Sequence, residues 1–243
     1  MTDTAQDTPQ DTTETAMGRW RLDGADPASI LQRLPKMDRV MLAIRLDDFM
    51  HERLGTVDSV TVDDGRIRVS GGEQAADLPA DAFASVVLDI STIMRDKLYP
   101  RLEFLDAAGE RIFSVTGLEG AAPMETALDG LPRTPLPANP PAPRDETAEP
   151  AEIDPADPGL ALLEKLQESA QPVTITAELS GLTQSWQGTI EKIVPMGGYI
   201  NVMTKGFHLH LAGGSVAGWE TDANGHRALD ADGAPTGLLV VPS

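Results

Sequence analysis

The 243-residue sequence contains no cysteine, and this absence excludes several kinds of chemistry. Disulfide bonds, thiolate metal sites and a cysteine nucleophile are all ruled out. A chain without cysteine also fits a reducing compartment.

Long apolar runs are missing as well. No stretch approaches the roughly 18 consecutive apolar residues that a membrane-spanning helix needs. The first residues, Met1–Gln6, have neither the basic region nor the apolar segment of a signal peptide. We therefore expect a cytoplasmic protein without membrane insertion.

Positive charge is scarce, with 19 Lys and Arg against 38 Asp and Glu, a formal net charge of −19. Such a mean field repels phosphate backbones and anionic lipid, so nucleic acid is not an expected partner. A small anionic ligand remains compatible with the sequence, because a few Lys and Arg gathered in one pocket determine the local potential.

Histidine is also rare, and two of the four histidines lie in the stretch Gly198–Leu211. A two-residue period predicts two strands joined at Lys205-Gly206. In the second strand, Phe207, Leu209 and Leu211 share an apolar face. His208 and His210 share the opposite face, about 7 Å apart at the rise of a strand.

Two interpretations of this histidine pair are open. The first is an ordinary half-buried strand whose polar face meets water. The second is a polar concavity in which neutral imidazoles bind a metal or haem iron, or cationic ones bind an anion.

Composition divides the chain into four segments. Residues 1–16 are rich in Thr, Asp and Gln, which predicts a disordered tail. Residues 17–119 and 159–243 show strand patterns. Between them, residues 120–158 are acidic and dense in proline, which predicts an extended linker.

Local patterns predict individual elements. We expect helices at 26–35 and 160–168, strands at 39–46 and 172–179, and a hairpin at 102–115. The polar residues 47–53 resemble a turn, in which His51 would be a surface residue.

An internal repeat relates the two strand-rich segments. A shift of 133 positions places Gly55-Thr56-Val57 on Gly188-Thr189-Ile190 and Gly65-Arg66-Ile67 on Gly198-Tyr199-Ile200. The shared order of turn glycines and apolar alternation predicts two copies of one sheet module. The fold class expected is α+β, with two tandem, mostly antiparallel modules and a few short helices.

Two groups of residues resemble bacterial haem-utilisation carriers. Residues 38–45, 51–52 and 102–109 resemble the first repeat of the HemS/ChuS type. Residues 198–203 and 207–211 resemble the core motif of the single-repeat ChuX/HutX type. The chain departs from the two-repeat carriers in having no histidine at 159–185 and in having Pro79 after Asp77-Leu78.

The resemblance implies a cytoplasmic protein that receives haem after import and passes it on or helps to degrade it. It makes His210 and His208 the candidate iron ligands, with Tyr199 as an alternative donor. Haem also needs cations for its propionates, and Lys205, Lys192 and Arg227 are the candidates. A haem importer or a downstream haem acceptor would be the partner.

Three functional classes follow. The first is a haem-binding and trafficking protein without enzymatic activity. The second is a haem-degrading enzyme whose chemistry resides in the bound iron, since the sequence shows no nucleotide-binding loop and no nucleophile with its base. The third is a divalent-metal-binding or interaction module that uses His208, His210 and a further histidine, His226.

Overall fold

The computed structural model describes residues 17–139 and 152–243. The tail predicted at 1–16 and part of the predicted linker, 140–151, lie outside the described residues. Within the described part, no helix is long and apolar enough to cross a membrane.

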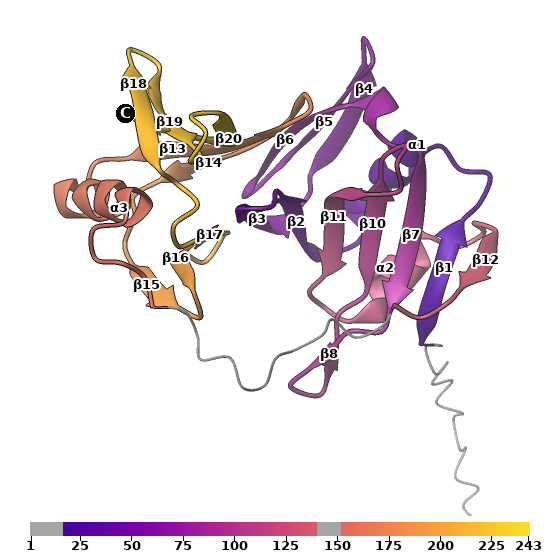
Figure 1. Cartoon of the computed structure of the whole chain (residues 1–243). Helices are drawn as coiled ribbons and strands as arrows, with labels where there is room; N and C mark the ends of the chain where they lie inside the picture. Colours follow the sequence, from indigo (N-terminus) through magenta and orange to yellow (C-terminus); the bar gives the residue numbers. More distant parts are fainter. Residues whose placement is uncertain (1–16, 140–151) are drawn as a thin grey trace, which may run out of the picture.

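Two large antiparallel sheets form the body of the protein, and each contains strands from both halves of the chain (Figure 1). The ten-stranded sheet runs, in spatial order, β12 (Arg133–Leu136), β1 (Gly18–Leu22), β7 (Ser85–Ile90), β10 (Arg101–Leu105), β11 (Arg111–Gly117), β2 (Arg39–Arg45), β3 (Phe49–Thr56), β17 (Phe207–Ala212), β16 (Tyr199–Met203) and β15 (Ile193–Met196). The eight-stranded sheet runs β18 (Gly218–Asp222), β19 (Gly225–Leu229), β20 (Pro235–Pro242), β13 (Val173–Leu179), β14 (Leu182–Gly188), β6 (Gln74–Pro79), β5 (Arg66–Gly71) and β4 (Ser59–Asp63).

The halves are joined by an exchange of three strands. Strands β4–β6 of the first half extend the sheet of the second, and β15–β17 of the second half extend the sheet of the first. Both junctions have the same register. At one junction His210 lies opposite Met50, and at the other Asp77 lies opposite Thr183. Asp77 comes 133 positions before His210, and Thr183 comes 133 positions after Met50. The repeat predicted from the sequence is thus a structural pseudo-two-fold.

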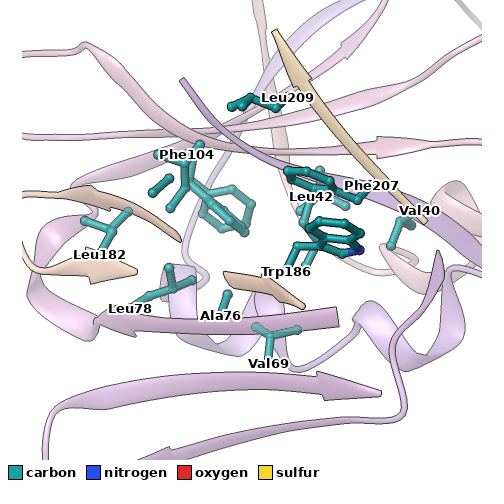
Figure 2. Packing of buried hydrophobic residues seen from close by; sticks show 14 of the residues in the cluster. Val40, Leu42, Val69, Ala76, Leu78, Phe104, Leu182, Trp186, Phe207 and Leu209 are labelled. Carbon is teal, nitrogen blue, oxygen red and sulfur yellow. The ribbon is translucent and has the colours of Figure 1, made fainter. Parts of the chain in front are cut away.

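Burial of apolar side chains between the sheets forms one continuous core (Figure 2). Trp186 of the eight-stranded sheet stacks on Phe207 of the ten-stranded sheet, with ring centroids 4.5 Å apart and an interplanar angle of 9°. Burying two such large side chains contributes more to stability than most other core contacts.

A pair of buried polar residues marks the centre of the pseudo-two-fold. His51 Nδ1 lies 3.3 Å from Gln184 Oε1, and these residues are separated by 133 positions. Their outer contacts are related in the same way, because His51 Nε2 lies 3.0 Å from the carbonyl of Ile175 and Gln184 donates to the carbonyl of Leu42 at 3.2 Å.

The turn predicted at 47–53 is therefore wrong. Strand β3 occupies Phe49–Thr56, and His51 has no exposed surface. The polar residues that suggested a turn are buried because hydrogen-bond partners from the second half of the chain offset the cost of removing them from water.

Within residues 17–139 and 152–243, three α-helices and two 3₁₀ turns accompany the sheets: α1 (Pro27–Leu31), η1 (Leu34–Lys36), η2 (Ala80–Ala82), α2 (Ala121–Ala127) and α3 (Pro158–Ser169). The small hairpin of β8 (Ile93–Met94) and β9 (Lys97–Leu98) projects from the first half (Figure 1). At α3, the Asp157 carboxylate accepts from the amides of Gly159, Leu160 and Gly214, which caps the helix and ties it to the segment after β17.

The sequence predicted an extended linker from residue 120, and this boundary is wrong. Helix α2 and edge strand β12 occupy part of that range, and α2 buries Ala121, Met124 and Ala127. Pro123 is compatible with the helix because it lies in the first turn, where backbone amides have no intrahelical partner.

The other predicted elements are confirmed with small boundary shifts. The helix expected at 26–35 is α1 followed by η1, and that at 160–168 is α3. The expected strands and hairpin are β2, β13 and β10–β11, and the stretch 198–211 forms β16 and β17.

Candidate functional site

The face of the ten-stranded sheet that points away from the core carries a cluster of ligating side chains. The alternation of β17 buries Phe207, Leu209 and Leu211 and places His208 and His210 on this outer face. Neighbouring β3 brings Glu52 directly opposite His208. We call Glu52, His208 and His210 the histidine–glutamate cluster.

The cluster is centred on the carboxylate. Glu52 Oε2 lies 3.3 Å from His208 Nδ1 and 3.5 Å from His210 Nε2. Burial by itself would raise the pKa of Glu52, but the hydrogen bonds and charges of the two imidazoles outweigh it and lower that pKa to about 2. Glu52 is therefore a carboxylate at neutral pH.

Asn201 on β16 fixes the orientation of the His210 ring. Its amide nitrogen donates to the carbonyls of Val194 at 2.8 Å and Tyr199 at 3.1 Å, so its Oδ1 must face the imidazole. That oxygen lies 2.6 Å from His210 Nδ1. His210 Nδ1 thus donates to Asn201, and Nε2 of the same ring points toward the Glu52 carboxylate.

His208 contacts Glu52 through its Nδ1, whereas His210 faces Glu52 with its Nε2. The Nδ1 of His208 donates to the Glu52 carboxylate, and among the described residues the Nε2 of His208 has no hydrogen-bond partner. A carboxylate behind the ring of a histidine is the arrangement that orients ligating imidazoles and raises their basicity. His208 Nε2 is therefore free to bind an external group.

Two further residues predicted from the sequence lie near this cluster. Tyr199 is on the same face of β16 as Asn201 and is 42% exposed, beside Met196, which is 67% exposed. Lys205 lies between β16 and β17 and lines a hollow of about 220 Å³ together with Arg39 and Leu54. Leu54 is two positions from Glu52 on the same face of β3.

The remaining candidates lie in the eight-stranded sheet. Arg227 forms an ion pair with Glu178 at 2.8 Å and lines a different hollow, of about 440 Å³. His226 contacts Thr221 Oγ1 through its Nδ1 at 2.8 Å. The structure thus groups His208, His210, Tyr199 and Lys205 on one sheet and separates Arg227 and His226 from them.

Glu52, Asn201 and Arg39 were not singled out as site residues from the sequence. The alternation of 199–203 already placed Asn201 on the polar face of its strand. For Glu52 no local signal exists, because its contact with His208 spans 156 positions and depends on the pairing of β3 with β17.

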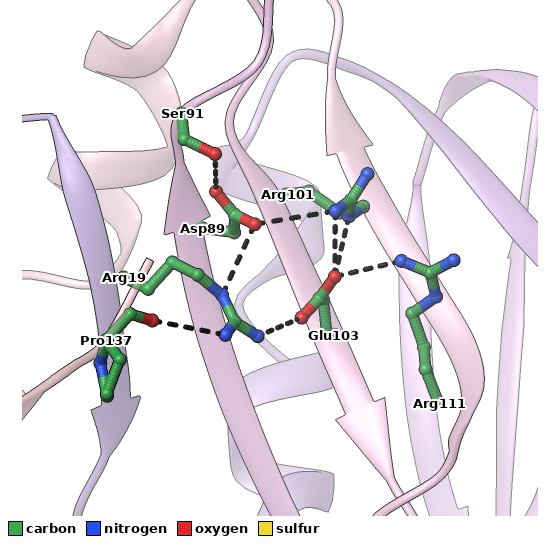
Figure 3. A network of polar contacts seen from close by, with 7 residues as sticks. All are labelled: Arg19, Asp89, Ser91, Arg101, Glu103, Arg111 and Pro137. Carbon is green, nitrogen blue, oxygen red and sulfur yellow. Dashed lines mark hydrogen bonds and ion pairs between the residues drawn. The ribbon is translucent and has the colours of Figure 1, made fainter. Parts of the chain in front are cut away.

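A second polar cluster on the same sheet face is compensated internally (Figure 3). The buried carboxylates of Asp89 and Glu103 lie among Arg19, Arg101 and Arg111, with Glu103 contacts of 2.8 to 2.9 Å. Burial would raise the pKa of Glu103, but the three guanidinium groups outweigh it and lower that pKa. Because its carboxylates are already paired, we assign this cluster a structural role.

The exchanged pair of sheets is a known tandem-repeat fold. The haem-degrading enzyme ChuS of Escherichia coli O157:H7 superposes with a TM-score of 0.72 at 18% identity, covering 93% of this chain and 81% of ChuS. The holo form of PhuS, a haem-binding protein from Pseudomonas aeruginosa, gives a TM-score of 0.71 at 18% identity, covering 93% of this chain and 82% of PhuS. No protein-family model matches the sequence, and no curated protein matches it significantly. The fold expected from the sequence resemblance is therefore confirmed.

Proposed function

We propose that this protein binds haem on the outer face of β16 and β17 and serves in haem uptake and trafficking. The observation that carries the proposal is a pair of partly exposed imidazoles on a fold shared with a haem-binding protein and a haem-degrading enzyme. Three properties of the face support a fit to haem: a nitrogen donor, an apolar surface and nearby cations.

His208 is the donor that we assign to the iron. Its Nε2 has no hydrogen-bond partner among the residues that the structure describes, whereas Nε2 of His210 points at Glu52. Glu52 holds the ring of His208 from behind, as outer partners of ligating histidines do. Haem iron is commonly held by one such histidine, so the donor chemistry fits.

The surface around the histidines is apolar and open. Met196, Tyr199 and Met203 are each more than 40% exposed, and they extend from the cluster across β15 and β16. Large exposed apolar side chains gathered at one place mark an interaction site. A flat porphyrin has the shape and the apolar character to cover them.

Cations for the propionates lie on the other side of the cluster. Lys205 and Arg39 line the hollow next to Leu54, with Glu73 also on its wall. Arg227, which belongs to the other sheet and is paired with Glu178, has no part in this assignment.

One haem per chain is the expected stoichiometry, because the positions related to the histidine–glutamate cluster by the pseudo-two-fold lack its imidazole donors. The positions equivalent to Glu52, His208 and His210 hold Ser185, Ala75 and Asp77. Asp77 is held by Arg66 at 2.7 Å. The counterpart on the eight-stranded sheet therefore has no imidazole for iron.

An absorbance titration of the apoprotein with ferric haem tests this proposal. We expect a saturable Soret shift with one haem per chain, and loss of that shift in the His208→Ala/His210→Ala double variant, which lacks both nitrogen donors. The matched control is His226→Ala, which removes a histidine from the other sheet and should titrate like the wild type.

A wild type without a Soret shift would refute the haem proposal. A shift that the double variant retains, or that His226→Ala loses, would refute the site. Addition of a reductant and oxygen to the complex then separates the two haem functions: a stable Soret band is expected for a carrier, and its bleaching with product release would identify a haem-degrading enzyme.

For a carrier, we propose a cytoplasmic location and two kinds of partner, a haem importer and a downstream haem acceptor. The absence of cysteine supports a reducing compartment. An open site on a sheet face supports transfer, because a ligand that is not enclosed can pass to another protein without unfolding of the carrier.

A further inference from the structure

We propose that the histidine–glutamate cluster is also a binding site for a free divalent transition-metal ion, independent of any porphyrin. The three ligand atoms, Glu52 Oε2, His208 Nδ1 and His210 Nε2, lie within 4.8 Å of one another. This proposal does not depend on haem binding, although it uses two of the same side chains.

The distances around the carboxylate are those of a coordination shell. With metal–ligand bonds of 2.0 to 2.1 Å, two ligands of a tetrahedral ion lie about 3.3 Å apart. Glu52 Oε2 is 3.3 Å from one imidazole nitrogen and 3.5 Å from the other. The imidazoles are partly exposed, so rotation about their Cβ–Cγ bonds can shorten the remaining separation.

The polar contacts around the cluster aim its ligand atoms at its centre. Asn201 accepts from His210 Nδ1, so Nε2 of the same ring points toward the carboxylate oxygen of Glu52. Among the described residues, Glu52 has no Lys or Arg partner within ion-pair distance that would compete with a metal ion.

The cluster also has the outer support of a metal site. Asn201 accepts from His210 and donates to main-chain carbonyls of Val194 and Tyr199, which fixes the ring in place. Outer partners of this kind orient ligating histidines and raise metal affinity.

Two imidazoles and one carboxylate select the class of ion. Imidazole suits Zn²⁺, Fe²⁺, Co²⁺ and their neighbours, whereas Mg²⁺ and Ca²⁺ prefer sites made of oxygen alone. Three protein ligands leave coordination positions open. Because the side chains of His208 and His210 are 20% and 24% exposed, water or another small ligand can reach those positions.

Haem and the free ion should exclude each other. In the haem complex, His208 uses Nε2 and keeps its proton on Nδ1, next to Glu52. In the metal site, His208 uses Nδ1, and the proton moves to Nε2. Glu52 is a ligand only in the second case.

Two titrations of the haem-free, tag-free full chain test the metal site. Binding of Co²⁺ is measured by the ligand-field absorption of the ion, and binding of Zn²⁺ is measured by the melting temperature of the protein. We expect one Co²⁺ per chain, a rise of the melting temperature with Zn²⁺ and no effect of Mg²⁺. Glu52→Gln, which keeps the shape of the side chain and removes its charge, should lose both metal effects. Asn201→Ala should weaken Co²⁺ binding about 10- to 100-fold.

His226→Ala is the control and should bind Co²⁺ like the wild type. His208→Ala, at a partly exposed position, is a second variant expected to lose Co²⁺ binding should Glu52→Gln fail to fold. Absence of stoichiometric Co²⁺ and Zn²⁺ binding in the wild type would overturn the metal site and leave the haem titration unaffected. Full Co²⁺ affinity in Glu52→Gln or in His208→Ala would overturn it as well.

Discussion

Acidification from pH 7 to pH 4 is expected to lower the free energy of unfolding by about 3 kcal/mol through His51 alone. Burial lowers the pKa of His51 from 6.5 to about 4, despite its hydrogen bonds to Ile175 and Gln184. Between these two values the unfolded chain binds a proton that the folded chain does not. Stability from this residue is therefore complete above pH 6.5 and falls progressively toward pH 4.

Denaturant unfolding of the wild type and of His51→Gln at pH 7 and pH 4 measures this contribution. Glutamine is the residue that the pseudo-two-fold places at position 184, and it can donate to the Ile175 carbonyl without taking up a proton. The difference between the two pH values should shrink by about 3 kcal/mol in His51→Gln and remain in the control His226→Gln. An equal pH dependence in wild type and His51→Gln would contradict a buried neutral histidine.

The largest loss of stability from a single side chain is expected for Trp186→Ala, about 3 to 5 kcal/mol. Trp186 is 6% exposed and stacks on Phe207, which belongs to the opposite sheet. Its ring also lies over Gly188, where an added Cβ would come within 2.3 Å of Trp186 Cζ2. Removing the indole leaves a cavity between the two sheets that this close packing cannot refill.

Urea unfolding of Trp186→Ala, Trp186→Phe and Val62→Ala at neutral pH tests this expectation. Trp186→Phe keeps an aromatic ring against Phe207 and should lose less than half as much as Trp186→Ala. Val62 is 43% exposed on edge strand β4, so Val62→Ala should change stability by less than about 0.5 kcal/mol. A loss below about 1 kcal/mol for Trp186→Ala would show that the sheets do not depend on this contact.

Regular alternation was sufficient to predict much of the fold. The apolar residues of β17 point into the core, and His208 and His210 share the opposite face, as the period of two requires. The repeat was also visible, because turn glycines recur where β3 and β14 end and where β5 and β16 begin. The alternation depends on neighbouring residues only, and the repeat can be found by comparing the sequence with itself.

Features that depend on distant pairing could not be predicted from the sequence. The sequence pattern around His51 and Glu52 is that of a polar turn. Their burial in a strand depends on contacts with the distant residues Gln184 and His208. The exchange of strands between the halves brings these partners together, and no local pattern encodes it. Glu52 was missed as a member of the site for this reason. The separation of Arg227 from the histidines follows from the same exchange, which places it in the other sheet.

The crystal structure of the chain with ferric haem is the measurement that tests the central claim most directly. We expect the iron bonded to Nε2 of His208, with Glu52 still in contact with Nδ1 of the same ring. The porphyrin should lie over Met196, Tyr199 and Met203. Haem bound in the hollow beside Arg227, or iron bound by a residue outside the histidine–glutamate cluster, would contradict the account.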